Sequence, residues 1–227
     1  MYYNDYIADL LRDKGLVLLG FADLRGTDPD LREGMDYGIC GAMALEVFPA
    51  VGDVPTMAYH DEYENVSRRL REIGRYLEET IRAKGFRAYS LTGESYDRER
   101  FSTTHLPIKT LATRAGLGWI GKSATLITPE YGNGVRLTGV ITDMPFETAQ
   151  PISTSSCGDC MECVRHCPAN AIVGNNWEAG MDRSLLVDPQ LCKEKMTRRG
   201  ELLGEEEGTC GICITVCPRT KRYIQQR

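Results

Sequence analysis

The sequence predicts an α+β fold whose C-terminal part is an irregular, cysteine-rich module. Three observations lead to this prediction: a long helical stripe of apolar residues, several short apolar runs of strand character, and the crowding of the cysteines. Eight of the nine cysteines lie in the last 71 of the 227 residues. We therefore expect an α+β body over residues 1–150 and a separate cluster-type domain over residues 151–227.

The clearest element of the body is a helix over about residues 62–84. Its apolar side chains recur at steps of three and four residues, which places them on one face: Val66, Leu70, Ile73, Leu77 and Ile81. Shorter helices are expected over residues 3–14 and 106–115. Strands are expected over residues 16–22, 42–48, 86–91, 124–128 and 135–143, the last two joined as a hairpin.

The cysteine spacing indicates iron–sulfur chemistry. Cys157, Cys160, Cys163 and Cys167, followed by Pro168, form the C-x2-C-x2-C-x3-C-P run of bacterial two-cluster ferredoxins. The second run, Cys210, Cys213, Cys217 and Pro218, has Glu207 where a leading cysteine would stand, and Cys192 is available upstream. In such modules the last cysteine of each run binds the other cluster. The predicted [4Fe–4S] ligand sets are Cys157, Cys160, Cys163 and Cys217 for one cluster, and Cys192, Cys210, Cys213 and Cys167 for the other.

Disulfides and zinc are the alternative interpretations of these cysteines. Disulfides suit short secreted domains, and this chain opens without an apolar signal segment. Zinc ribbons use two C-x2-C pairs, which leaves the third closely spaced cysteine and the C-x3-C-P endings unexplained. The remaining cysteine, Cys40, is expected to pack as a small buried hydrophobe.

Composition narrows the class of protein. The net charge of −5 and the pI near 5.4 disfavour broad binding to nucleic acid. No apolar run approaches the ~18–20 residues that a membrane-spanning helix needs, and reduced thiols lead us to expect a cytoplasmic protein. One basic cluster is either a solvated rim or a docking face for an acidic electron donor or a polynucleotide: Lys193, Lys195, Arg198, Arg199, Arg219, Lys221, Arg222 and Arg227.

A glycine-rich loop over residues 116–123 satisfies both G-x-G-x-x-G and the phosphate-loop pattern G-x4-G-K-[ST]. Both mechanisms need a strand before the glycines and a helix after them. Here the preceding residues are helical in character and the following ones are β-branched, so the context is reversed and nucleotide binding is disfavoured. The alternatives are a tight structural turn around Trp119 or a loop whose bare backbone approaches a large cofactor.

The loop Ala115-Gly-Leu-Gly-Trp-Ile-Gly-Lys122, with the split cysteine set downstream, resembles epoxyqueuosine reductase and, more distantly, the reductive dehalogenases. The resemblance implies a nitroreductase-like, corrinoid-binding type of α+β body, with two [4Fe–4S] clusters that feed electrons to cobalamin. It also implies that the loop borders the corrinoid through Gly116, Leu117, Gly118, Trp119, Ile120, Gly121 and Lys122.

The chain departs from that family in three ways. The stretch over residues 102–109 lacks the aspartate that is the family's presumed proton donor, the N-terminal region is shorter, and the chain ends ten residues after Cys217 without a C-terminal repeat domain. For this reason the tRNA substrate is not carried over. Of the three histidines, His105 falls nearest the missing donor and suits proton transfer near neutral pH, with Lys109 one helical turn later to orient an anionic group. His60 is expected just before the long helix, near its N-cap, and His166 at the surface near a cluster.

Two functions follow from these patterns. The first is an iron–sulfur oxidoreductase that passes low-potential electrons, received from a donor such as ferredoxin or flavodoxin, to bound cobalamin or to a substrate. The second is a non-enzymatic electron-transfer or reductive-activation protein without its own corrinoid. A cofactor cavity would favour the first, and a space filled by side chains would favour the second.

Overall fold

The computed structural model describes every residue except 1, 50–53, 92–95, 98–101, 104 and 207. Its helices are α1 (Asn4–Leu11), α2 (Met57–Ala83), α3 (Ile108–Arg114), α4 (Glu162–Arg165), α5 (Pro189–Glu201), α6 (Ile212–Thr215) and α7 (Pro218–Gln225), with a 3-10 turn at Arg183–Leu185. Its strands are β1 (Leu18–Asp23), β2 (Tyr37–Ala44), β3 (Ala88–Ser90), β4 (Tyr96–Asp97), β5 (Ser102–Thr103), β6 (Trp119–Ile120), β7 (Leu126–Ile127) and β8 (Val135–Thr142). Glu207, the position of the missing cysteine, lies outside the described residues.

The chain divides into two compact units. The first comprises residues 1–44, 66–117 and 136–152, and the second comprises residues 45–65, 118–135 and 153–227. The glycine loop is therefore shared between them, because the units change at residues 117 and 118. Within the described ranges, none of the helices combines the length and apolarity needed to cross a bilayer.

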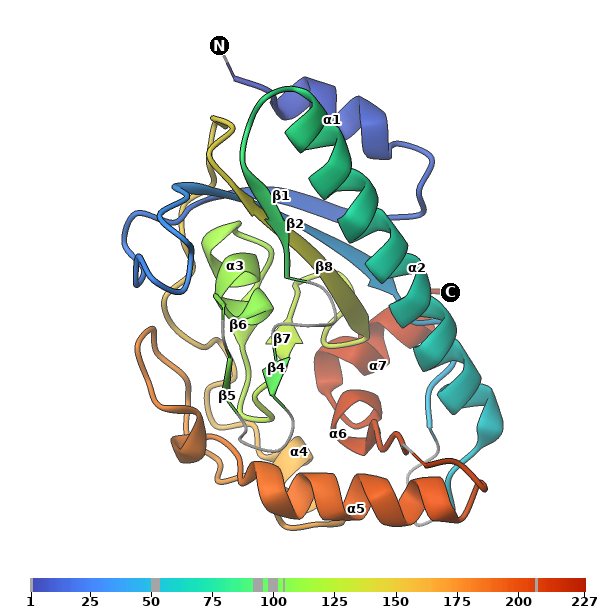
Figure 1. The fold of residues 1–227 in the computed structure, drawn as a ribbon. Coiled ribbons are helices and arrows are strands. Elements are labelled where there is room, and N and C mark those ends of the chain that lie inside the picture. The colour runs from blue at the N-terminus through green and yellow to red at the C-terminus, as the bar shows by residue number, and fades with distance from the viewer. Residues whose placement is uncertain (1, 50–53, 92–95, 98–101, 104, 207) are drawn as a thin grey trace. The chain divides into compact units, whose positions relative to one another are not determined.

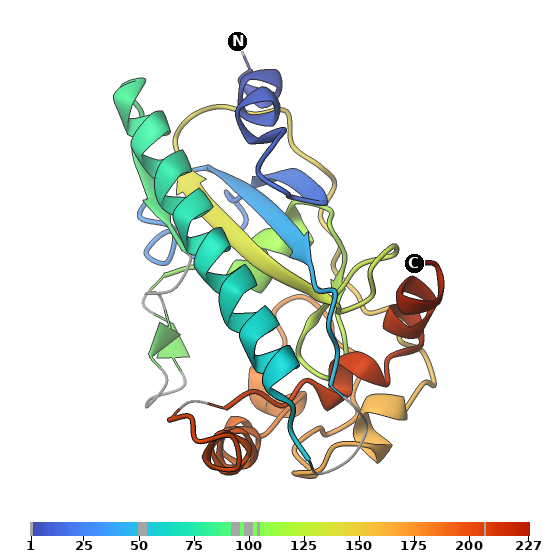
Figure 2. The same cartoon turned by 90° about the vertical axis from the view of Figure 1, so that its right-hand side faces the viewer.

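The first unit is built on a four-stranded sheet in the order β1-β2-β8-β3 (Figure 1). Neighbouring residues of β8 point to opposite faces. Thr138 donates a hydrogen bond to the backbone carbonyl of Leu70 in α2, whereas Gly139 leaves room for Leu111 of α3. The sheet thus carries α2 on one face and α3 on the other, an arrangement that is visible in the turned view (Figure 2).

The long helix confirms the predicted apolar stripe. All five stripe residues are buried, with at most 6% of any of them exposed. Helix α2 begins at Met57, five residues earlier than expected, so it takes in His60. The expectation that His60 precedes the helix is therefore wrong, and its side chain is only 8% exposed. Cys40 on β2 is fully buried, as predicted for a small hydrophobe.

Two strand predictions differ from the structure. The second strand runs from Tyr37 to Ala44 instead of 42–48, because its register pairs Leu18 with Ala42 and Asp23 with Tyr37. The glycines of this strand are weak β-formers that hide it from a propensity argument. The predicted hairpin between residues 124–128 and 135–143 is also wrong, because β7 pairs with β6 while β8 joins the four-stranded sheet.

Candidate iron–sulfur site and the histidine site

The second unit repeats one local structure in its two cysteine runs. Helix α4 starts two residues after Cys160, and helix α6 starts two residues after Cys210. Each helix has four residues and is followed by a cysteine and a proline. The two short helices pack against each other. The C-x2-C-x3-C-P spacing therefore corresponds to a loop, one helical turn and a stop at proline.

The thiols of the first predicted ligand set surround one hollow that is partly open to solvent. It is lined by Cys157, Cys160, Cys163, Cys217 and Cys213, together with Lys122, Ser123, Ile127, Asn133 and Pro218. The structure thus brings Cys217, from the end of the second run, to the three leading cysteines of the first. This arrangement is the one expected if the last cysteine of a run crosses over.

The electrostatics of Cys163 reflect this grouping. Burial is the largest cause that raises the pKa of its thiol to about 11, and the neighbouring Cys157, Cys217 and Cys160 raise it as well. A buried group of thiols cannot ionise together without a compensating cation. The donor set therefore fits a strongly cationic iron–sulfur core, which binds thiolates.

The second predicted ligand set gathers around Cys213. Burial raises the pKa of its thiol far above the ordinary value, and Cys210, Cys192, Cys163 and Cys167 each raise it further. The pKa of Cys210 is raised by burial, while Arg199 and Lys195 act in the opposite direction. Cys213 also faces the hollow of the first set, so it lies where the two groups of thiols meet.

Among the residues that the structure describes, no tighter metal centre accompanies these thiols. In the described part of the chain, no three His, Cys, Asp or Glu side chains converge closely enough to hold a single metal ion. Zinc requires four donors at about 2.0–2.3 Å from one point. The cysteines instead surround a space, which suits a cluster with iron at several corners.

The glycine loop is a turn packed against the strand that follows it. A Cβ atom on Gly118 would lie 2.1 Å from the carbonyl oxygen of Ile127, and one on Gly121 would lie 2.3 Å from the Ile127 side chain. A Cβ atom on Gly121 would also lie 3.4 Å from Sγ of Cys157, in ordinary van der Waals contact, so this part of the loop lies beside a cluster thiol. Helix α3 precedes the loop, β6 lies within it and β7 follows it, which confirms the reversed context and disfavours a phosphate loop.

A hydrogen-bond network connects the wall of the hollow to the backbone of a cluster cysteine. The buried side chains of Asn133 and Thr220 are joined by a 2.7 Å hydrogen bond from the Thr220 hydroxyl. The Thr220 hydroxyl also accepts from the Asn133 backbone N–H at 3.0 Å. The Asn133 amide then donates to the Cys213 carbonyl at 3.3 Å and to Thr125 at 3.0 Å. Sequence reasoning missed this network, because neither residue belongs to a motif.

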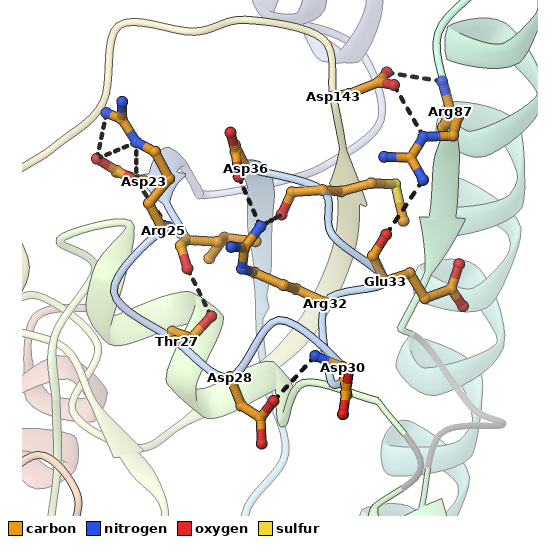
Figure 3. A network of polar contacts seen from close by, with 12 residues as sticks. Asp23, Arg25, Thr27, Asp28, Asp30, Arg32, Glu33, Asp36, Arg87 and Asp143 are labelled. Atoms are coloured by element: carbon orange, nitrogen blue, oxygen red, sulfur yellow. Dashed lines mark hydrogen bonds and ion pairs between the residues drawn. The ribbon is translucent and has the colours of Figure 1, made fainter.

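His105 belongs to a separate site in the first unit. Its Nε2 lies 2.9 Å from Oε1 of Glu33, and its ring stacks on Tyr89 with 4.0 Å between the ring centroids. The histidine side chain is 18% exposed. Glu33 has φ of +51°, a strained value for a residue other than glycine. Arg87 donates to the Glu33 carbonyl at 3.2 Å while it pairs with Asp143 (Figure 3), which helps to hold the strained turn.

The other predicted site residues are accounted for as follows. Lys109 is half-buried in α3, four residues after His105. His166 is exposed and its Nδ1 lies 2.9 Å from the Glu162 carbonyl. Leu117, Trp119 and Lys122 of the glycine loop are buried, and Nε1 of Trp119 has no hydrogen-bond partner among the described residues. That the loop borders a corrinoid stays a prediction.

Comparison with known proteins agrees with the geometry of the cysteines. Residues 156–220 match a family model described as a 4Fe-4S double cluster binding domain. Epoxyqueuosine reductase from Listeria monocytogenes is 36% identical over 121 residues, 50% of this chain and 29% of that protein. Epoxyqueuosine reductase from Synechococcus sp. (strain CC9605) is 31% identical over 216 residues, 89% of this chain and 59% of that protein.

Solved structures show the same relationship at the level of the fold. The structure of epoxyqueuosine reductase with an epoxyqueuosine-modified tRNA stem loop has a TM-score of 0.60 and 25% identity, covering 96% of this chain and 65% of that one. A reductive dehalogenase described as B12-dependent has a TM-score of 0.66 and 19% identity, covering 91% of this chain and 30% of that one. The chain spans between 29% and 59% of the length of the two curated relatives above. It is therefore a homologue of the epoxyqueuosine reductases that carries a double [4Fe–4S] cluster binding domain, with reductive dehalogenases among its structural relatives.

Proposed function

We propose that the chain is an iron–sulfur oxidoreductase that passes low-potential electrons through two [4Fe–4S] clusters to a bound cofactor or substrate. The observation that carries this proposal is the convergence of Cys157, Cys160, Cys163 and Cys217 on one hollow. A second group of thiols around Cys213 adds a second electron site. Bound clusters supply one-electron transfer at low potential.

In this proposal each residue set has a defined task. The first set holds one cluster, and Cys192, Cys210, Cys213 and Cys167 hold the other. Ile127 and Pro218 line the hollow with apolar surface and limit the access of water. The Asn133–Thr220 network fixes the backbone that carries Cys213. A rigid frame around the thiols favours fast transfer, because little has to rearrange when charge changes.

Cobalamin is the acceptor we propose. The fold resemblance to a dehalogenase described as B12-dependent supports it, as does the resemblance of the loop over residues 116–122 to that of epoxyqueuosine reductase. The body would then be of the nitroreductase-like, corrinoid-binding type, extending over about residues 1–150. The tRNA named with one solved relative is not part of this proposal.

His105 is the proton donor we propose, with Lys109 orienting an anionic group. The Glu33 carboxylate, 2.9 Å from Nε2, can orient the ring, and the Tyr89 ring supports its face. A low-potential donor such as ferredoxin or flavodoxin would supply the electrons. Lys193 and Arg198 are exposed on α5, the helix that also carries Cys192, and they make the surroundings of the second set favourable for an acidic partner. Such a protein would work in the reducing cytoplasm.

A second candidate is an electron-transfer or reductive-activation protein without a corrinoid of its own. The observation that favours it is the packing of Gly118 and Gly121, whose bare faces are already used against Ile127. Under this alternative the loop is a structural support for the cluster hollow, and the electron acceptor is another protein.

Anaerobic purification tests the cluster proposal. The protein should carry about eight iron and eight sulfide per chain, the content of two cubane clusters. An iron-free protein that reconstitution with ferrous iron and sulfide cannot load would refute it.

Cobalamin addition then separates the two candidates. Base-off binding should shift the visible band of cob(II)alamin, and dithionite should reduce it to cob(I)alamin faster with the holoprotein than with a cluster-free preparation. An unshifted spectrum and no heat of binding at tens of micromolar protein would favour the electron-transfer candidate. If binding occurs, His105→Ala should leave affinity unchanged and slow turnover about 10²-fold.

A further inference from the structure

Lys122 is a buried lysine beside the proposed cluster. Lys122 directly follows Gly121 in the glycine loop. It is only 4% exposed, and it lines the same hollow as Cys157, Cys160 and Cys163. Taking an ammonium group out of water is costly unless an opposite charge or several acceptors compensate it. A lysine in this position therefore requires a partner.

The hydrogen-bond partner of the Lys122 ammonium is a weak acceptor. Nζ donates to Sδ of Met161 at 3.4 Å, and a thioether is a poor acceptor. Among the described residues, no carboxylate forms an ion pair with Lys122. The contact nevertheless shows the direction of the side chain, because Met161 stands between Cys160 and Cys163 in the loop that carries the first ligand set.

Met161 itself is held in place. A Cβ atom on Gly174 would lie 2.8 Å from its terminal methyl group, so the glycine makes room for this side chain. Glu162, the nearest carboxylate in sequence, is engaged elsewhere, with Arg165 at 3.0 Å. Lys122 thus lines a hollow whose other walls are thiols and mainly apolar groups, and its ammonium lies against the loop that carries three of those thiols.

We propose that Lys122 is the buried counter-charge of the cluster held by Cys157, Cys160, Cys163 and Cys217, and that it raises the reduction potential of this cluster. This inference rests on the proposed function. On reduction the cluster accepts one electron from a low-potential donor and gains one negative charge, with no bond broken and no proton transferred. A fixed positive charge in a water-poor site stabilises the reduced form more than the oxidised form.

This role replaces two simpler ones. A lysine that only solvates a turn would be exposed, and Lys122 is not. A contact of Lys122 with a corrinoid amide has no observation behind it in the structure, whereas the contact of its Nζ with the cysteine loop is present. A cation next to the first cluster also raises its reduction potential relative to that of the second cluster. If the second cluster has less positive charge near it, the first cluster is the one that accepts the electron.

The test compares Lys122→Met with Lys122→Arg in anaerobic holoprotein. Met keeps the length and removes the charge, whereas Arg keeps the charge. Lys221→Met, on the exposed side of α7 in the same unit, is the matched control for charge removal. Midpoint potentials are measured by redox titration followed by electron paramagnetic resonance, and Cys192→Ser identifies which signal belongs to the second cluster.

In Lys122→Met the ratio of reduced to oxidised first cluster at fixed ambient potential should fall about tenfold, a shift of about 59 mV to lower potential. The second signal, Lys122→Arg and Lys221→Met should stay close to wild type. An unchanged potential in Lys122→Met with full iron content would overturn the inference, as would an equal shift of both signals.

Two further outcomes are also decisive. If Lys122→Met loses the first cluster but Lys122→Arg and a reconstituted Lys122→Gln keep it with the Gln potential lowered, the charge role is supported. If Met and Arg both lose the cluster, the side chain acts through its shape and the inference fails. Absence of clusters in wild-type protein would instead refute the proposed function, which the iron and sulfide content shows independently.

Discussion

Removal of the Thr220 hydroxyl should destabilise the cluster-bearing unit. Thr220 is fully buried, and its hydroxyl satisfies both the backbone N–H and the side-chain oxygen of Asn133. Thr220→Val keeps the shape of the side chain but leaves these two buried polar groups without that partner. Each unsatisfied group costs about 1–3 kcal/mol, so we expect a loss of about 2–4 kcal/mol in the free energy of unfolding.

The assay is urea unfolding of anaerobic holoprotein, followed by far-ultraviolet circular dichroism at a fixed incubation time. With a urea slope of about 3 kcal/mol/M, the midpoint should fall by about 1 M. Because Asn133 also donates to the Cys213 carbonyl at 3.3 Å, iron should be lost faster to a chelator. Thr220→Ser is the control, since it keeps the hydroxyl and removes one methyl group at about 1 kcal/mol. A valine variant as stable as the serine variant would refute the reasoning.

Three other perturbations have definite expected outcomes. Cys192→Ser should reduce iron from about eight to about four per chain, and elemental analysis that finds both clusters intact would contradict the ligand assignment. Gly118→Val should lower the thermal midpoint sharply, because its Cβ would meet the Ile127 carbonyl at 2.1 Å, whereas Gly180→Ala, which has open space and only the strain of a φ of +88°, should have a smaller effect; equal midpoints would refute this account. The hydrogen bond from Arg25 lowers the pKa of Asp23 to about 2. A depressed folded-state pKa means stability present above pH ~4 that disappears as pH falls through 2, and being near the surface this contribution should stay below about 1 kcal/mol. Asp23→Asn should flatten that part of the pH–stability curve, and an identical acid dependence in this variant would show that the pair contributes nothing.

The sequence alone determined the features that depend on local spacing. The cysteine runs indicated a two-cluster module, and the structure shows the same loop, helical turn and proline stop in both runs. The five-residue apolar stripe determined the long helix, because a period of 3.6 places those side chains on one buried face. The helical character before the glycine loop and the strand character after it also disfavoured a phosphate loop, and the structure confirms that order.

Tertiary structure decided the features that depend on residues distant in sequence. Strand β7 pairs with β6 because the glycine loop allows a close approach to Ile127. The residues between 128 and 135 instead suggested a hairpin between β7 and β8, and they carry no sign of the pairing with β6. Glu33 meets His105 across 72 positions of sequence, through a strained turn that no motif marks. The sequence pattern of the glycine loop does not reveal whether Lys122 is exposed or buried. Only packing places its charge beside the cluster thiols, since burial is a property of what surrounds a residue and not of the residue itself.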